Sequence, residues 1–242
     1  DRKEARKLDR YAQYAIVAAK EAIENSGLDL EVEDKNEIGV VVAAGIGGME
    51  TLENEVSNYA VNIEKGPRFN PFFIPKMISD IAAGQISILY GFRGPNYSTA
   101  SACASSTNAL IDAFNLIRLG KANAIVAGGA EAAIIPCAIG GFNAMKALST
   151  RNDSFETASR PFSSSFYGFV MGEGAACMIF EELEHALARG ADIICEVAGG
   201  GLSADAYHLT ATHPEGEGAI LVMQRALKDA GLTPADIDYI NV

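Results

Sequence analysis

The sequence predicts an α/β domain built on a mainly parallel, mixed sheet with helices on both faces. Strand-like and helical segments alternate along the chain, which is typical of this class. The strand-like runs are almost continuously apolar, as expected of strands covered on both sides. They lie at Ile38–Ala44, Ala124–Gly129 and Ala176–Phe180. With 242 residues, 49% of them hydrophobic, the chain can bury a substantial core.

The first predicted helix carries apolar residues at three-to-four-residue spacing from Leu8 to Ile23 and stops at Gly27. The strand at 38–44 runs directly into the glycine-rich stretch 45–48. A dinucleotide-binding fingerprint would need glycine where the chain has Glu50, so a close-packed turn is predicted there. After an irregular aromatic stretch, Pro75 is expected to open a helix that runs through residue 88.

The central stretch places Cys103 between a predicted strand, Tyr97–Ala102, and a helix that ends before Gly120. The unpaired N–H groups at a helix start would stabilise a thiolate, and they could also hold the oxyanion of a thioester under attack. This is the geometry of a nucleophile. A free cysteine among Ala and Ser is more often a small buried side chain, so the local pattern alone leaves both interpretations open.

The remaining segments continue the α/β alternation. Glu131 follows the strand at 124–129 in an apolar setting, where a hydrogen-bonded strut is favoured over a catalytic acid. Cys177 and Cys195 fall in predicted strands and are expected in the core. After residue 175 the predicted elements are strand 176–180, helix 181–189, strand 193–197, helix 219–230 and strand 238–242.

Composition excludes several classes of function. A net charge of −12 argues against a nucleic-acid binder, because phosphate binding needs a dense cationic face. The four cysteines have neither CxxC spacing nor paired histidines at metal-ligand spacing, so no metal site and no disulfide framework are expected. No run of about 18 apolar residues predicts a membrane span, and the first residues lack a signal-peptide pattern. We expect a cytoplasmic protein, and we expect these 242 residues to be a fragment of a longer chain.

Six motifs occur in order along the chain: YGFRGPNYSTASACASS, VAGGAE, GGFNAMKALSTRND, ASRPF, GFVMGEGA and DAYHLT. Together they resemble the elongating β-ketoacyl-[acyl-carrier-protein] synthases of type II fatty acid synthesis, along all 242 residues. The resemblance implies a thiolase-like layered αβαβα fold made of two similar halves. Residues 1–242 would form a single domain, most of the N-terminal half, without the opening strand region and the C-terminal half.

The resemblance also implies roles for particular residues. Cys103 matches the acyl-accepting nucleophile, Ile46 and Phe142 match residues that line the acyl pocket, and Phe73 matches a residue that reaches the partner subunit's pocket in a homodimer. The partner protein would be an acyl-carrier protein bearing acyl or malonyl phosphopantetheine, and no cofactor is expected. Its acidic surface would suit a basic docking patch, matched by Lys3, Arg6, Lys7, Arg68 and Lys146.

The implied reaction is decarboxylative condensation of the acyl thioester on Cys103 with malonyl-acyl-carrier protein, which gives a 3-oxoacyl product. The family's catalytic histidines and lysine would lie beyond Val242, so the chain alone is expected to be inactive. One departure is Ser163–Tyr167, where the family usually has a charged run; another is Ala176 in place of a usual glycine.

Two other functions remain open at this point. One is a Cys–His hydrolase or amidase that uses Cys103 with His208 or His213 as the base. The other is a non-catalytic chain-length partner, although such partners usually lack the cysteine that is present in this sequence.

Overall fold

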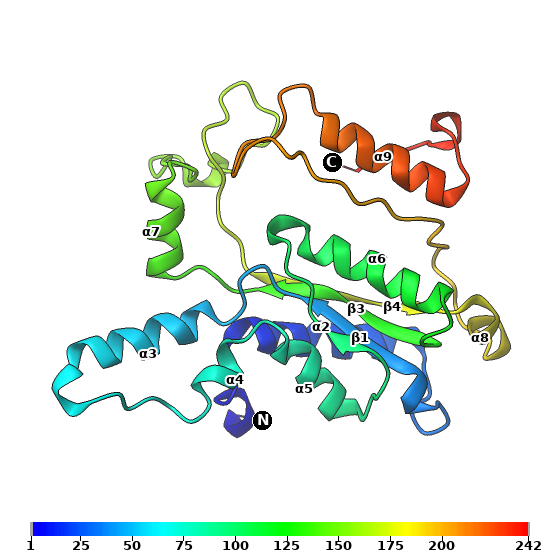
Figure 1. Cartoon of the computed structure of the whole chain (residues 1–242), viewed down its shortest axis with the longest axis horizontal. Helices are drawn as coiled ribbons and strands as arrows, with labels where there is room; N and C mark the ends of the chain where they lie inside the picture. The colour runs from blue at the N-terminus through cyan, green and yellow to red at the C-terminus, as the bar shows by residue number, and fades with distance from the viewer. Residues whose placement is uncertain (1, 242) are drawn as a thin grey trace.

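A four-stranded mixed sheet forms the centre of the computed structural model, which describes residues 2–241 (Figure 1). The strand order is β2-β1-β3-β4; β1 pairs in parallel with both β2 and β3, whereas β4 is antiparallel to β3. The predicted alternation of strands and helices around a mainly parallel sheet is therefore confirmed. The strands are β1 (Ile38–Ala43), β2 (Asn96–Tyr97), β3 (Ala124–Glu131) and β4 (Gly174–Glu181).

Helices cover both faces of this sheet. The face covered by α2 and α5 includes Val40 and Val42, and the face covered by α6 includes Val41 and Ala43, which is the alternation expected of a strand. All residues of β1 are buried, so the almost continuous apolar run has its predicted cause. The helices are α1 (Arg2–Ala5), α2 (Arg10–Ser26), α3 (Met49–Val61), α4 (Phe73–Met77), α5 (Ile81–Tyr90), α6 (Ser105–Arg118), α7 (Pro136–Ala144), α8 (Leu183–Ala188) and α9 (Glu217–Ala230).

The predicted helix from Pro75 through residue 88 is wrong, because the chain breaks between α4 and α5. Ile78 is extended, and its carbonyl oxygen accepts a hydrogen bond from the Tyr11 hydroxyl at 2.6 Å. The extended backbone at Ile78 ends α4, and the chain becomes helical again only at Ile81, where α5 begins.

The predicted strand Tyr97–Ala102 is also wrong beyond Tyr97. Pairing between β1 and β2 is confined to Val40 with Asn96 and Val41 with Tyr97. After this point the chain bends toward α6, and Ala102 is exposed. Hydrogen bonds within the bend, several of them made by Ser105, replace those of a sheet.

The predicted strands at 193–197 and 238–242 are absent from residues 2–241, and Val242 lies outside the described residues. A strand needs a neighbour that supplies hydrogen-bond partners, and no described strand pairs with either segment. Ile194 is 96% exposed, and Cys195 is exposed rather than in the core as predicted.

The segment around Gly199–Gly201 instead packs between α6 and α9. A Cβ atom on Gly200 would lie 2.9 Å from Cγ1 of Ile111, and one on Gly201 would collide with the backbone of Val222. Arg118 and Asp229 join the two helices with an ion pair of 2.9 Å. Only glycine allows the backbone this close an approach on both sides.

Candidate functional site

The segments that follow β1, β2 and β3 meet at one edge of the sheet. These three neighbouring strands are parallel, so their carboxyl ends point the same way. A Cβ atom built on Gly45, after β1, would lie 3.1 Å from Oε2 of Glu131, at the end of β3, and 3.4 Å from the carbonyl oxygen of Ala102. This edge therefore gathers the residue next to Cys103, the glycine-rich turn and Glu131.

Cys103 is exposed and lies just before α6 as predicted, but it follows a bend in place of the predicted strand. It lies in a short 3-10 turn, Ala102–Ala104, that leads directly into α6. Ala102 has a φ of 52°, a left-handed conformation that is uncommon for a residue other than glycine. Such conformations persist where surrounding contacts hold them, and they concentrate at functional sites. The alternative of a buried structural cysteine is wrong.

Ser105 supplies the contacts that hold this bend. Its side chain is buried; the hydroxyl donates to the carbonyl oxygen of Ala102 at 2.7 Å and accepts the N–H of Ser101 at 2.8 Å. The Thr99 hydroxyl donates to the backbone carbonyl of Ser105 at 2.8 Å. The bend before Cys103 is thus fixed by hydrogen bonds on both sides of Ala102.

Glycines of the VAGGAE motif allow the start of α6 to approach the sheet. A Cβ atom on Gly129 would collide with Oγ of Ser106, and one on Gly128 would collide with the carbonyl oxygen of Ala176. The absence of side chains at both positions lets α6 and β4 pack directly against β3. The motif therefore helps to set where Cys103 lies.

Glu131 is a strut, as favoured from the sequence. Its carboxylate accepts the backbone N–H of Ile46 at 2.7 Å and that of Gly47 at 3.2 Å. Both bonds are to a charged acceptor and cross from β3 to the turn after β1. Ile46, predicted to line the acyl pocket, is 47% exposed beside them.

The two aromatic side chains predicted for the site lie on different helices. Phe142, on α7, is half-buried and meets the ring of Phe169 edge-on at 5.4 Å between centroids. Phe73, at the start of α4, stacks on Phe69 at 5.2 Å. Each ring, one on α4 and one on α7, therefore packs against an aromatic neighbour of its own.

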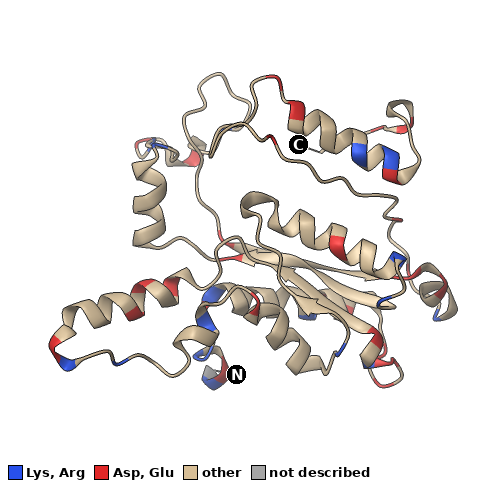
Figure 2. Ribbon diagram, viewed as in Figure 1, with Lys and Arg blue, Asp and Glu red and all other residues tan. Residues whose placement is uncertain are grey.

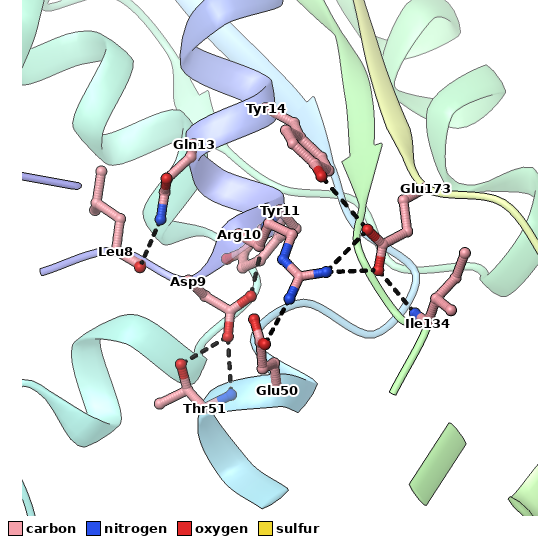
Figure 3. A network of polar contacts seen from close by, with 10 residues as sticks. All are labelled: Leu8, Asp9, Arg10, Tyr11, Gln13, Tyr14, Glu50, Thr51, Ile134 and Glu173. Atoms are coloured by element: carbon pink, nitrogen blue, oxygen red, sulfur yellow. Dashed lines mark hydrogen bonds and ion pairs between the residues drawn. The ribbon is translucent and has the colours of Figure 1, made fainter. Parts of the chain in front are cut away.

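An ion-pair network around Arg10 was not predicted from the sequence. Figure 3 shows its guanidinium between Glu50 of α3 and Glu173 before β4, at 2.6 and 3.1 Å. Glu173 also accepts the N–H of Ile134 at 2.9 Å and a bond from the Tyr14 hydroxyl at 3.4 Å. No local pattern signals this network, because its members are up to 163 positions apart.

Burial acts to raise the pKa of Glu173, but the Ile134 N–H, Arg10 and Tyr14 together lower it below its ordinary value. The network therefore keeps a carboxylate charged where α2, α3 and the segment after β3 meet.

The predicted basic docking residues do not form a single cluster within the chain. Lys3, Arg6 and Lys7 lie at the N-terminus, where Lys7 pairs with Glu4 at 2.8 Å. Lys76 of α4 joins them, since its Nζ lies 3.5 Å from the carbonyl oxygen of Arg6. Figure 2 shows this group at the N-terminal end, apart from the far end of α7, which Lys146 follows. Lys76 was not predicted for this group, because the sequence displays its charge but not its place beside α1.

Arg68, also predicted for docking, is exposed on the connection between α3 and α4.

The two histidines considered as bases are engaged within their own loop. Nδ1 of His208 accepts the N–H of Thr210 at 3.2 Å, and Nδ1 of His213 accepts that of Glu215 at 3.2 Å. No hydrogen bond between either ring and Cys103 occurs in residues 2–241. The structure therefore does not support a Cys–His hydrolase.

Metal-ligand clusters and membrane-spanning helices are both absent from the described part of the chain. No group of three or more His, Cys, Asp or Glu side chains is placed to hold a metal ion within residues 2–241. In the same residues, no helix has the length and apolar character needed to cross a membrane.

Two family models match the chain: residues 1–186 match the beta-ketoacyl synthase N-terminal domain, and residues 194–242 match its C-terminal domain. The chain is 50% identical over 242 residues to 3-oxoacyl-[acyl-carrier-protein] synthase 2 of Staphylococcus aureus, and 47% identical over 241 residues to that of Vibrio cholerae. It covers 59% and 58% of these relatives, so it spans less than two thirds of their length.

Solved structures show the same fold. A beta-ketoacyl synthase from Burkholderia phymatum superposes with a TM-score of 0.90 at 32% identity, over all of this chain and 58% of the other. A type II PKS ketosynthase, in complex with its acyl-carrier protein and bound to a hexaketide, superposes with a TM-score of 0.89 at 31% identity, over 96% of this chain and 58% of the other. These likenesses confirm the predicted thiolase-like fold.

Proposed function

The chain belongs to the beta-ketoacyl synthase family, and from this premise we propose that it is the part of a 3-oxoacyl-[acyl-carrier-protein] synthase that carries the nucleophile. Sγ of Cys103 attacks the carbonyl carbon of an acyl thioester, and the phosphopantetheine thiol leaves with a proton. Malonyl-acyl-carrier protein then loses carbon dioxide, and the resulting enolate carbon attacks the acyl carbon. The bond to Sγ breaks, which releases the 3-oxoacyl product and regenerates the cysteine.

The observation that carries this proposal is the position of Cys103. It is exposed, it immediately follows the left-handed Ala102, and it precedes a 14-residue helix with no acidic residue in its first turn. A helix start offers N–H groups to a developing oxyanion and favours negative charge. This arrangement suits acyl transfer to sulfur.

The acyl chain is proposed to lie along Ile46 and Phe142. Ile46 sits on the turn whose Gly45 approaches Ala102, and Phe142 lies on the helix that follows β3. Phe73 is proposed to contribute to the pocket of a partner subunit in a homodimer. Exposed apolar side chains on α3, on α4 and on the connection between them support such an interface. They include Leu52, Val56, Val61, Ile63, Phe69, Phe72 and Ile74.

The proposed partner is an acidic acyl-carrier protein. We propose that its docking surface comprises Lys3, Arg6, Lys7, Arg68 and Lys146. Lys76, whose Nζ lies 3.5 Å from the Arg6 carbonyl oxygen, is proposed to join it. A positive surface on a chain with a net charge of −12 supports recognition of an acidic partner rather than general anion binding.

All four cysteines are unpaired, which fits a reducing cytoplasmic compartment. The single domain at residues 1–242 stays a prediction.

The test compares residues 1–242 with an extended protein, in which the regions of the Staphylococcus aureus relative outside the matched stretch are added at both ends. Each is given acyl- and malonyl-acyl-carrier protein, and the 3-oxoacyl product is measured by mass spectrometry. We expect product from the extended protein, none from residues 1–242, and none from the extended Cys103→Ala variant. An extended protein that acylates a residue other than Cys103 would overturn the proposal.

A further inference from the structure

We propose that Glu131 is a positioning residue for the acyl chain, and that it acts by fixing the main chain of Ile46. This inference deepens the proposed function, on which the role of Ile46 rests. The structure contributes what the sequence could not: the carboxylate of Glu131 and the N–H groups of Ile46 and Gly47 lie within hydrogen-bond distance across 84 or more positions of the chain.

The turn that carries Ile46 has little regular structure to hold it. β1 ends at Ala43 and α3 begins at Met49, so residues between them lack the bonds of a sheet or helix. The Gly48 N–H donates to the carbonyl oxygen of Met77 at 3.0 Å and thereby fixes the far end of the turn. At Ile46 itself, the tether of 2.7 Å is the side chain of Glu131.

Glycines on both sides of Ile46 make this tether possible. Gly47 has a φ of 86°, which a residue with a side chain rarely adopts. In this conformation the N–H groups of Ile46 and Gly47 both point toward the Glu131 carboxylate. Gly45 lies between Glu131 and Ala102, where a Cβ atom would press on both. The turn therefore lies against the carboxylate on one side and the bend before Cys103 on the other.

The bend before Cys103 has its own restraints. Ser105 holds Ala102 and Ser101 through its hydroxyl, and neither bond involves Glu131. Loss of the Glu131 tether should therefore make the turn at Ile46 more mobile and leave Cys103 in place. The expected signature is weaker binding of long acyl chains with an unchanged acylation rate at saturation.

The substitution Glu131→Gln removes the charge at nearly constant shape. A glutamine oxygen can accept one of the two N–H groups, but its NH2 group would face the other N–H. The control is Glu181→Gln. Glu181 lies at the opposite end of the β3–β4 ladder and pairs with Arg189, so its loss removes an ion-pair partner at a place remote from Ile46 along the sheet.

The readout is acylation of Cys103 in the extended protein by short and long acyl-pantetheine thioesters, followed by intact mass spectrometry. For Glu131→Gln we expect the half-saturating concentration of the long thioester to rise about fivefold or more, with the saturating rate and the short-chain parameters retained. In Glu181→Gln, the ratio of the half-saturating concentrations of the long and short thioesters should be that of the wild type. Hydrogen exchange should show faster exchange at Ile46 and Gly47 in Glu131→Gln only.

A double-mutant cycle separates positioning from a general structural effect. In an Ile46→Ala background, Glu131→Gln should have little further effect on the long thioester, because the positioned side chain is already absent. The inference would be overturned if Glu131→Gln left the half-saturating concentration of the long thioester unchanged. It would also be overturned if Glu131→Gln raised that concentration equally in the wild-type and Ile46→Ala backgrounds. If the wild-type protein were not acylated at Cys103, the proposed function would be refuted instead. The tether is tested separately: it would be refuted if amide hydrogen exchange at Ile46 were the same in Glu131→Gln as in the wild type.

Discussion

The buried hydroxyl of Ser105 donates a hydrogen bond of 2.7 Å to the carbonyl oxygen of Ala102, the left-handed residue that precedes Cys103. The oxygen of that hydroxyl also accepts the Ser101 N–H at 2.8 Å. One side chain thereby stabilises a backbone conformation that a non-glycine residue adopts only at a cost of about 1–3 kcal/mol. The position of Cys103 depends on this contact.

Ser105→Ala should therefore destabilise the bend. It leaves the Ser101 N–H and one Ala102 bond unmade, at a cost of about 1–3 kcal/mol in the free energy of unfolding, and it should slow acylation of Cys103 about tenfold. Urea denaturation and intact-mass acylation kinetics measure the two effects. Thr107→Ala, an exposed position on the first turns of α6, is the matched control and should leave both nearly unchanged. Equal acylation rates in Ser105→Ala and wild type would contradict the role given to Ser105.

Cys103 should be alkylated first among the four cysteines. Burial raises the pKa of Cys177 to about 12, so that thiol should be nearly inert at neutral pH. Cys195 is exposed but does not lie at a helix start, and Cys137 donates its N–H to Glu53 at 2.9 Å, which places a carboxylate beside it. Limiting iodoacetamide followed by peptide mapping gives the order. Faster labelling of Cys137 or Cys195 would remove the main support for Cys103 as the nucleophile.

Charge reversal at Arg6, Lys7 and Arg68 should weaken binding of an acyl-carrier protein to the extended protein by about tenfold or more. The proposed contacts are exposed ion pairs, so wild-type affinity should also fall as salt is raised. Titration at two salt concentrations tests both statements. Lys20→Glu on α2, where Lys20 pairs with Glu24 at 3.5 Å, is the control and should bind normally. If the triple variant kept its affinity and salt dependence, docking would have to occur elsewhere.

Lys76→Glu tests the proposal that Lys76 belongs to this surface. Because its Nζ lies near the backbone of Arg6, we expect it to weaken carrier-protein binding in the same direction as reversal of Arg6. The effect of the two reversals together, measured by the same titration, should be less than the product of the single effects if both contact one carboxylate cluster. Wild-type affinity in Lys76→Glu would exclude it from the docking surface.

The Arg10–Glu173 pair should make stability depend on pH in the acid range. The folded-state pKa of Glu173 is lowered, so its contribution is present above the unfolded pKa and is lost as pH falls through the folded value. Glu173→Gln should lower the free energy of unfolding by about 1–3 kcal/mol at pH 7, and the difference from wild type should shrink below about pH 4. Denaturant unfolding at both pH values measures this.

Glu24→Gln is the control for that experiment. The Lys20–Glu24 pair is on an exposed face, with both side chains 61% exposed, and such pairs contribute little to stability. We therefore expect a small change at pH 7 for Glu24→Gln. A difference between Glu173→Gln and wild type that stayed constant with pH would show that packing, rather than charge, explains the effect.

The sequence by itself determined the alternation of strands and helices, the two-sided burial of β1 and the start of a helix just after Cys103. These features are local: apolar periodicity and glycine positions set them within a few residues. It also indicated that Glu131 would be a hydrogen-bonded strut, because a carboxylate in an apolar setting needs partners.

Only the tertiary structure decided which partners those residues have. Strand formation at 193–197 depends on a neighbouring strand, which the sequence cannot display, and the described chain supplies none. At the break before α5 the Ile78 carbonyl oxygen accepts the Tyr11 hydroxyl, and the network of Arg10 with Glu50 and Glu173 likewise joins segments far apart in the chain. Hydrogen bonds and ion pairs between distant segments leave no periodic trace in the sequence, so these contacts, and the tether between Glu131 and Ile46, are visible only in the fold.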